Sequence, residues 1–233
     1  MDEKPSNPDY LKPLEAIHVA DPRSDNQAVL DMFQAGAIAL DEHHCAVASL
    51  NVSAAVPQDV LVQFETAKNL YLYAWFVYRF FPVAEHHALT CLELGLQHRF
   101  SGPLPKKYWN KPWKPTLRPL LCFAIDTGVI KNEGFRQWRD QVNIRAEQRY
   151  SLERQREMYE QGLSRIELDY SQAIPNDQDR NWDYVSILRE VLPEIRNSYA
   201  HGSALLHRQV LGTLELVSEI LNQLFECSEV KSK

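Results

Sequence analysis

DYVSILREVLPEIRNSYAHGSALLHRQVLGTLELVSEILNQLF, residues 183–225, predicts two consecutive helices joined at Gly202. The second helix, expected from Ala204 to Phe225, carries a heptad-like row of apolar side chains: Leu206, Val210, Leu214, Val217, Leu221 and Leu224. Side chains at this spacing share one helix face, and that face must be buried against other helices. The stretch therefore predicts the last part of a helical bundle.

The rest of the chain also shows helical periodicity, interrupted by proline-rich stretches. Helices are expected over residues 28–40, 58–81, 83–100 and 116–130, and one or two solvent-facing helices over 134–170. Pro82 is expected to separate the second from the third, and the proline-rich stretches 101–115 and 173–180 are expected to be loops. Residues 45–55 alternate loosely, which suits either a short strand or an extended segment. We predict an all-α bundle over residues 58–228, preceded by an N-terminal extension over residues 1–57.

Composition excludes several classes of enzyme. The 233 residues include only 8 glycines, and no G-x-G-x-x-G, G-x-x-x-x-G-K-[ST] or G-x-S-x-G motif occurs, which argues against nucleotide-loop and nucleophile-elbow enzymes. The four cysteines form no C-x-x-C pair, so zinc ribbons are excluded. The clusters 43–45 (HHC) and 85–87 (EHH) consist of adjacent residues, whose side chains point apart in a helix or strand. We therefore expect no metal site and no cofactor.

Charge is distributed unevenly along the chain. Residues 1–65 carry 11 acidic and 3 basic side chains, residues 66–165 carry 9 and 16, and residues 166–233 carry 11 and 6. A basic middle can attract a polyanion locally despite the net charge of −6, because salt limits electrostatic reach to about 10 Å. The first residues, MDEKPS, do not resemble a signal peptide, and the most apolar window, residues 70–84, contains Arg79 and Pro82. We expect a cytoplasmic protein without a membrane span.

The sharpest chemical feature is Arg196-Asn197 followed by His201 and Gly202, near the end of the first quoted helix. Arginine donates parallel hydrogen bonds to phosphate, and histidine can exchange a proton near neutral pH. At 100° per residue, Asn197 and His201 lie on the face opposite the apolar stripe of this helix, with Arg196 at its flank. The apolar stripe consists of Leu188, Leu192, Ile195 and Tyr199. The polar groups are therefore expected to face water or a second subunit.

This arrangement resembles the HEPN superfamily (higher eukaryotes and prokaryotes nucleotide-binding), whose signature is R-x(4–6)-H with a polar residue after the arginine. Arg196, Asn197 and His201 match it with a spacer of four, in the penultimate helix of an all-α chain. The stretch 88–99 (ALTCLELGLQHR) is similar to an earlier HEPN helix in which a glutamate recurs, and Glu93 occupies that position. The resemblance covers roughly residues 60–226 and does not extend to the segment before Pro57.

The resemblance implies a homodimer in which two motif helices face each other across a cleft. Catalytic members cut RNA without a metal, by attack of the 2′-hydroxyl on the adjacent phosphate. In that scheme His201 moves a proton, Arg196 stabilises the phosphorane and Asn197 positions the phosphate, with Glu93 and Tyr199 as supporting candidates. A toxin or defence effector with a cognate inhibitor protein would fit this activity.

Two alternative hypotheses compete with the ribonuclease hypothesis. Some members of the superfamily only bind nucleotides or RNA, or serve as dimerisation modules, and the chain could belong with them. In the second hypothesis the chain is a helical adaptor without catalytic residues. Arginine and histidine near a helix C-terminus, followed by glycine, also occur at ordinary helix ends, so the motif needs no chemical role.

A second candidate surface is the stretch from Arg99 to Arg118, which contains six basic residues, the two arginines included, and no acidic one. Cations that bind phosphates and aromatic rings that stack on unpaired bases are typical of single-strand RNA surfaces. The competing reading is a proline-rich loop whose aromatic side chains pack onto the bundle. The RNA-binding candidates are Lys106, Lys107, Tyr108, Trp109, Lys111, Trp113 and Lys114.

Overall fold

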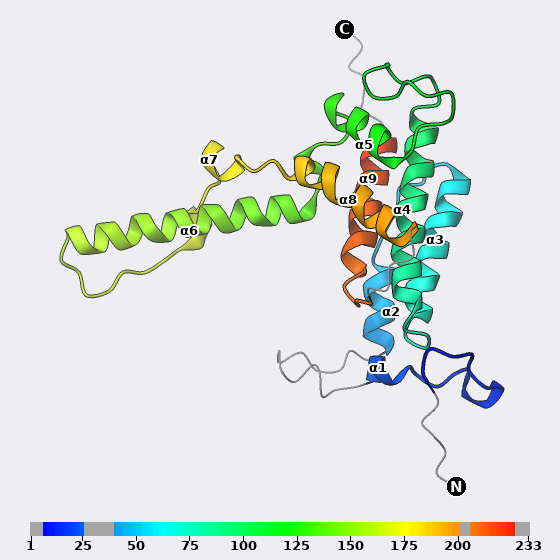
Figure 1. The fold of residues 1–233 in the computed structure, drawn as a ribbon. Helices are drawn as coiled ribbons and strands as arrows, with labels where there is room; N and C mark the ends of the chain where they lie inside the picture. Colours follow the sequence, from blue (N-terminus) through cyan, green and yellow to red (C-terminus); the bar gives the residue numbers. More distant parts are fainter. Residues whose placement is uncertain (1–6, 26–39, 201–205, 227–233) are drawn as a thin grey trace.

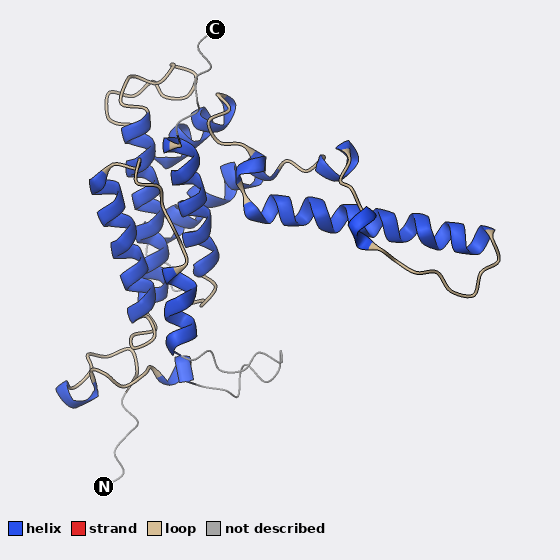
Figure 2. Ribbon diagram, turned by 180° about the vertical axis from the view of Figure 1, so that it is seen from behind, coloured by secondary structure: helices blue, strands red, loops and turns tan. Residues whose placement is uncertain are grey.

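The architecture comes from a computed structural model, which describes residues 7–25, 40–200 and 206–226. Within these ranges the chain forms helices and no strand (Figure 2). The elements are η1 (Leu14–Ala16), α1 (Pro22–Asp25), α2 (Leu40–Ala48), α3 (Gln58–Tyr73), α4 (Phe80–Arg99), α5 (Leu117–Asp126), η4 (Asn132–Gly134), α6 (Arg136–Glu160), η5 (Tyr170–Gln172), α7 (Asp177–Arg180), α8 (Tyr184–Ala200) and α9 (Leu211–Phe225). The prediction of an all-α bundle is confirmed.

The bundle is built around α4, which packs against α3, α5, α8 and α9 (Figure 1). Leu89, Leu92 and Leu96 of α4 are completely buried, because neighbouring helices cover more than one side of it. Gly95 allows α9 to approach closely: a Cβ atom there would lie 2.6 Å from Cδ2 of Leu221. The core thus forms along the helix whose C-terminal half carries Glu93.

Several sequence predictions about helix boundaries are wrong. The helix expected up to residue 130 ends at Asp126, and the last helix, expected from Ala204, begins at Leu211. The helix expected up to residue 81 ends at Tyr73, and Pro82, expected to separate two helices, lies inside the first turn of α4. Proline is tolerated there because the first amides of a helix have no partner within it. The short strand or extended segment expected over residues 45–55 is wrong at its start, because residues 45–48 belong to α2, whereas residues 49–55 form neither helix nor strand. Helix α2 buries His43 and Val47, four residues apart, against the bundle.

The N-terminal region contributes to the same core. Val47, Leu50 and Val56 are buried in it, and Ser53 N–H donates to Oδ1 of Asn222 on α9 at 2.7 Å. The helix predicted over residues 28–40 lies outside the described residues except for its last position, which begins α2. Segment 40–57 is therefore packed against the bundle.

Helix α6 projects away from the bundle, and the chain returns along it through η5 and α7 (Figures 1 and 2). The one or two helices predicted over 134–170 are this single 25-residue helix, and the loop predicted at 173–180 includes the four-residue α7. The buried residues of α6, Trp138, Val142 and Ala146, lie in its first half. The remainder has no core to pack against.

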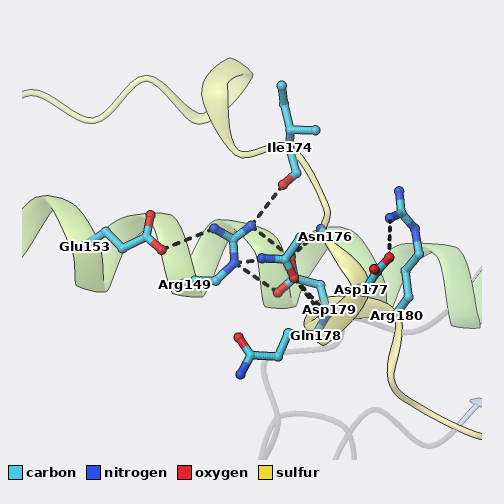
Figure 3. Close-up of polar contacts among 8 residues, drawn as sticks. All are labelled: Arg149, Glu153, Ile174, Asn176, Asp177, Gln178, Asp179 and Arg180. Carbon is cyan, nitrogen blue, oxygen red and sulfur yellow. Dashed lines mark hydrogen bonds and ion pairs between the residues drawn. The ribbon is translucent and has the colours of Figure 1, made fainter.

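Polar contacts hold the returning segment onto α6. Arg149 donates from Nη2 to Oδ2 of Asp179 and to the carbonyl of Ile174, both at 2.9 Å, and from Nη1 to Oε1 of Glu153 at 3.3 Å (Figure 3). The Asp179 carboxylate also accepts the N–H of Asn176 at 2.9 Å. We call α6, η5 and α7 the arm, and the contacts of Arg149 with Asp179 and Ile174 the clasp.

Candidate active site

Helix α8 positions the predicted motif as its amphipathic pattern indicates. Leu188 and Leu192 are buried, and Ile195 packs against the core. Asn197 is exposed on another face of the helix. The predicted burial of Leu188 and Leu192 and the predicted exposure of Asn197 are therefore confirmed, and Asn197 is accessible to a ligand. His201 lies outside the described residues.

Arg196 turns toward the bundle and meets the glutamate that the sequence resemblance singled out. Its Nη2 lies 3.3 Å from Oε2 of Glu93 on α4, and the same oxygen accepts the N–H of Leu117 at 3.0 Å. Glu93 thereby links α4, the start of α5 and α8. Arg196 remains partly exposed, whereas its Nε is buried and has no hydrogen-bond partner among the described residues. The guanidinium is held by one carboxylate, and its exposed part can contact another anion.

A second carboxylate holds the end of α8. Glu85 is buried; its Oε2 accepts the Tyr199 hydroxyl at 2.5 Å, and its Oε1 accepts the Thr213 hydroxyl at 2.6 Å. His207 Nε2 lies 3.2 Å from the Glu85 carboxylate and 3.0 Å from the Tyr199 oxygen. Burial and the bond to Glu85 raise the pKa of Tyr199, so its hydroxyl stays protonated and donates. We call Glu85, Tyr199, His207 and Thr213 the Glu85 network.

Sequence reasoning missed most of this network. In the sequence, Glu85 and its neighbour His86 stand out only as poorly spaced metal ligands, and no pattern singles out His207. One usable signal was a single carboxylate within the apolar run FFPVAE of residues 80–85, since a buried charge needs partners. Its partners come from residues far away in the sequence, so their identity was not visible. Among the described residues, no group of three or more His, Cys, Asp or Glu side chains could hold a metal ion.

The basic loop between α4 and α5 divides into two parts. Tyr108 packs edge-on against Phe123 at 5.2 Å and donates its hydroxyl to Asp126 at 2.7 Å. This side chain therefore fixes the loop to α5, as the competing structural interpretation expected. Lys107 lies over the outer side of the same ring, 4.6 Å from its centroid, and remains exposed.

The other aromatic side chains form a cluster farther along this loop. Trp109 and Trp113 meet edge to face at 6.2 Å, and Nζ of Lys111 lies 5.2 Å from each ring centroid. Trp113 is 58% exposed, and Lys106 and Lys114 are exposed as well. At the loop's end, Arg118 forms ion pairs with Glu190 and Glu194 of α8, each at 2.7 Å. The lysines and Trp113 thus remain available for a ligand, whereas Arg118 is engaged with α8.

Comparisons with known proteins yield no relative: no protein-family model, no curated protein and no solved structure matches the chain. In the described ranges, no helix is both long and apolar enough to cross a membrane.

Proposed function

We propose that the chain is a HEPN-like, metal-independent endoribonuclease that works as a homodimer. The contact between Arg196 and Glu93 carries this proposal, because it joins the two motif positions that the resemblance identified independently in the sequence. A partly buried carboxylate that holds a partly exposed arginine fixes the direction in which the arginine's other donors point. Asn197, next in the chain, is exposed beside it.

The proposed reaction needs no group from outside the chain and its RNA. The 2′-oxygen attacks the adjacent phosphorus, and the bond from phosphorus to the 5′-oxygen breaks. The products are a 2′,3′-cyclic phosphate and a 5′-hydroxyl, so the proton lost by the 2′-hydroxyl is balanced by one gained at the 5′-oxygen. His201 manages a proton, Asn197 positions the phosphate, and Arg196 stabilises the negative charge that develops on it.

The outer face of α8 supports a dimer. Ile187 and Val191, four residues apart on this helix, are 46% and 43% exposed. Exposed apolar side chains on a helix are favourable places for a second copy of the same helix, and Asn197 is exposed on a different side of α8. In this dimer the two motif helices enclose the substrate cleft, and the lysines and Trp113 of the basic loop bind RNA outside it.

The main experiment compares Arg196→Ala and His201→Ala with the unchanged protein on a single-stranded RNA. Loss of a group that stabilises developing charge lowers the cleavage rate by about 100- to 1,000-fold. Arg189→Ala is the matched control, because this arginine lies on the same helix and is paired with Asp126 away from the motif. Cleavage should persist in EDTA and stop when the scissile 2′-hydroxyl is replaced by hydrogen.

Each result that contradicts the proposal points to a different alternative. Full activity of both motif variants would overturn the proposal, as would a monomeric mass by light scattering at tens of micromolar. RNA binding without cleavage would favour a non-catalytic nucleotide- or RNA-binding module. The same Arg196–Glu93 contact favours that alternative in one respect, since the carboxylate offsets part of the arginine charge. If cleavage is found, an inhibitor encoded by a neighbouring gene would identify a toxin or defence effector.

A further inference from the structure

A pocket opens beside the motif, between the start of α4 and the end of α8. It has a volume of about 460 Å³, and its lining includes Arg79, His86, His87, Thr90 and Tyr199. Arg79 is already paired with Asp9 at 2.7 Å, so the pocket's wall presents mainly aromatic rings and apolar atoms. Pockets of this kind, with a few polar groups at their edge, suit flat organic groups better than free anions.

Two aromatic rings line this pocket next to each other. The imidazole of His86 and the phenol of Tyr199 have centroids 6.4 Å apart, and their planes differ by 28°. Centroid separations of about 4.5–7 Å are usual for aromatic pairs that are offset from each other. The two rings therefore form one aromatic wall of the pocket, against which a further flat ring can stack.

The side chains of Tyr199 and His86 differ in how firmly they are anchored. Tyr199 is held by the Glu85 network through its hydroxyl, and its side chain lines the pocket. No such bond anchors the His86 side chain among the described contacts, so its ring can rotate to fit a ligand. Burial, followed by the positive charge of Arg196, lowers the pKa of His86, which favours its neutral imidazole. A neutral ring beside a fixed ring forms a stacking platform.

Arg196 connects this platform to the proposed chemistry. Arg196 lies three residues before Tyr199 on α8, and its partner Glu93 lies three residues after Thr90 on α4, so the guanidinium lies on the side of the pocket that Thr90 and Tyr199 line. A nucleotide carries its base and its phosphate on opposite sides of the ribose. A phosphate that contacts Arg196 can therefore send its base into the pocket, and stacking of unpaired bases on aromatic side chains is a common means of binding single-stranded RNA.

We propose that this pocket receives an unpaired base of single-stranded RNA, which stacks against His86 and Tyr199 next to the phosphate held by Arg196. The identity of the ligand as RNA rests on the proposed function, whereas the stacking of a base can be tested without cleavage. Stacking accepts any base, so the pocket confers a requirement for single-stranded substrate more than a sequence preference.

The test is a titration of the full chain with adenosine 5′-monophosphate and with ribose 5-phosphate, followed by calorimetry or NMR. The nucleotide should bind, and the sugar phosphate should bind at least about fivefold more weakly because it lacks the stacked base. His86→Ala should weaken nucleotide binding by a similar factor, and His86→Phe should restore it. His98→Ala is the matched control, since His98 lies on the same helix and contacts Asp59 instead of the pocket.

Equal affinity for the two ligands would overturn the base pocket, as would a His86→Ala variant that binds the nucleotide normally. His86→Phe also separates stacking from proton transfer, because phenylalanine preserves a flat ring and removes the titratable nitrogen atoms. Base-dependent binding in a protein that never cleaves RNA would refute the ribonuclease and leave the pocket intact. Cleavage that His86→Ala does not affect, in rate or in KM, would refute the pocket and leave the ribonuclease intact.

Discussion

The bundle and the arm are both helical, but different interactions stabilise them. Helix α4 is covered by four other helices, and its central leucines are completely buried. Helix α6 carries exposed apolar side chains along its outer part, Leu152 and Tyr159 among them, and the clasp ties this part of the arm to its return segment. Burial of apolar area stabilises the first region, whereas oriented polar contacts determine the second. Mutations in the two regions should therefore differ in how much they lower the free energy of unfolding and in how much of the molecule they affect.

The largest effect is expected in the bundle. Leu92→Ala removes a completely buried side chain from the centre of α4, which should lower the free energy of unfolding by about 2–5 kcal/mol through lost burial and the cavity left behind. Chemical denaturation followed by circular dichroism measures it. The matched control, Leu152→Ala on α6, is 66% exposed and should cost under about 0.5 kcal/mol. Equal costs would contradict the contrast between the two regions.

An intermediate effect is expected where the arm joins the bundle. Trp138 is buried near the start of α6 and donates from Nε1 to the carbonyl of Trp182, just before α8, at 2.8 Å. Trp138→Phe removes this donor and leaves the carbonyl without it, which should cost about 1–2 kcal/mol. Trp113→Phe in the exposed loop is the control, with an expected cost under about 0.5 kcal/mol. If Trp138→Phe were as mild as the control, the arm would be joined to the bundle by other contacts.

The smallest and most local effect is expected at the clasp on acidification. Hydrogen bonds from Arg149 and from the Asn176 amide lower the pKa of Asp179 below its ordinary value of 3.8. Because the folded pKa is the lower one, this contribution is complete above pH 3.8 and is lost as the pH falls through the lowered value. The methyl signals of Ile174 in NMR spectra should then report release of the return segment.

Arg149→Ala provides the control for this acid effect. It should shift the Ile174 signals toward the released position already at neutral pH and remove most of their response to acid. The melting temperature of the bundle should change little, because the clasp lies outside its core. A loss of bundle stability as large as that of Leu92→Ala would mean that arm and bundle unfold as one unit.

The sequence predicted the parts of this fold that depend on local periodicity. The apolar stripe of α8 and the exposure of Asn197 follow from helical spacing alone, and the structure places them accordingly. Helix boundaries were harder to predict from the sequence, as Pro82 shows. Proline disrupts the interior of a helix but is accommodated in its first turn, and a shift of one turn in the boundary changes which case applies.

The candidate site was predicted less completely. The resemblance supplied both Glu93 and Arg196, which are 103 positions apart in the sequence and 3.3 Å apart in the structure. The Glu85 network could not be anticipated, because its members come from α4, α8, α9 and the segment before α9, and no local pattern links them. The same holds for the pairing of His86 with Tyr199. Long-range packing determines such contacts, and a single sequence does not record it.

The length of α6 has a hydrodynamic consequence. Its 25 residues form a rod about 37 Å long, and much of it extends beyond the bundle (Figure 1). A compact chain of 233 residues would have a radius of gyration of about 17 Å. A single molecule with this arm should exceed that value, tumble anisotropically and elute from a sizing column ahead of spherical proteins of 27.0 kDa. Early elution alone would therefore be no sign of a second subunit.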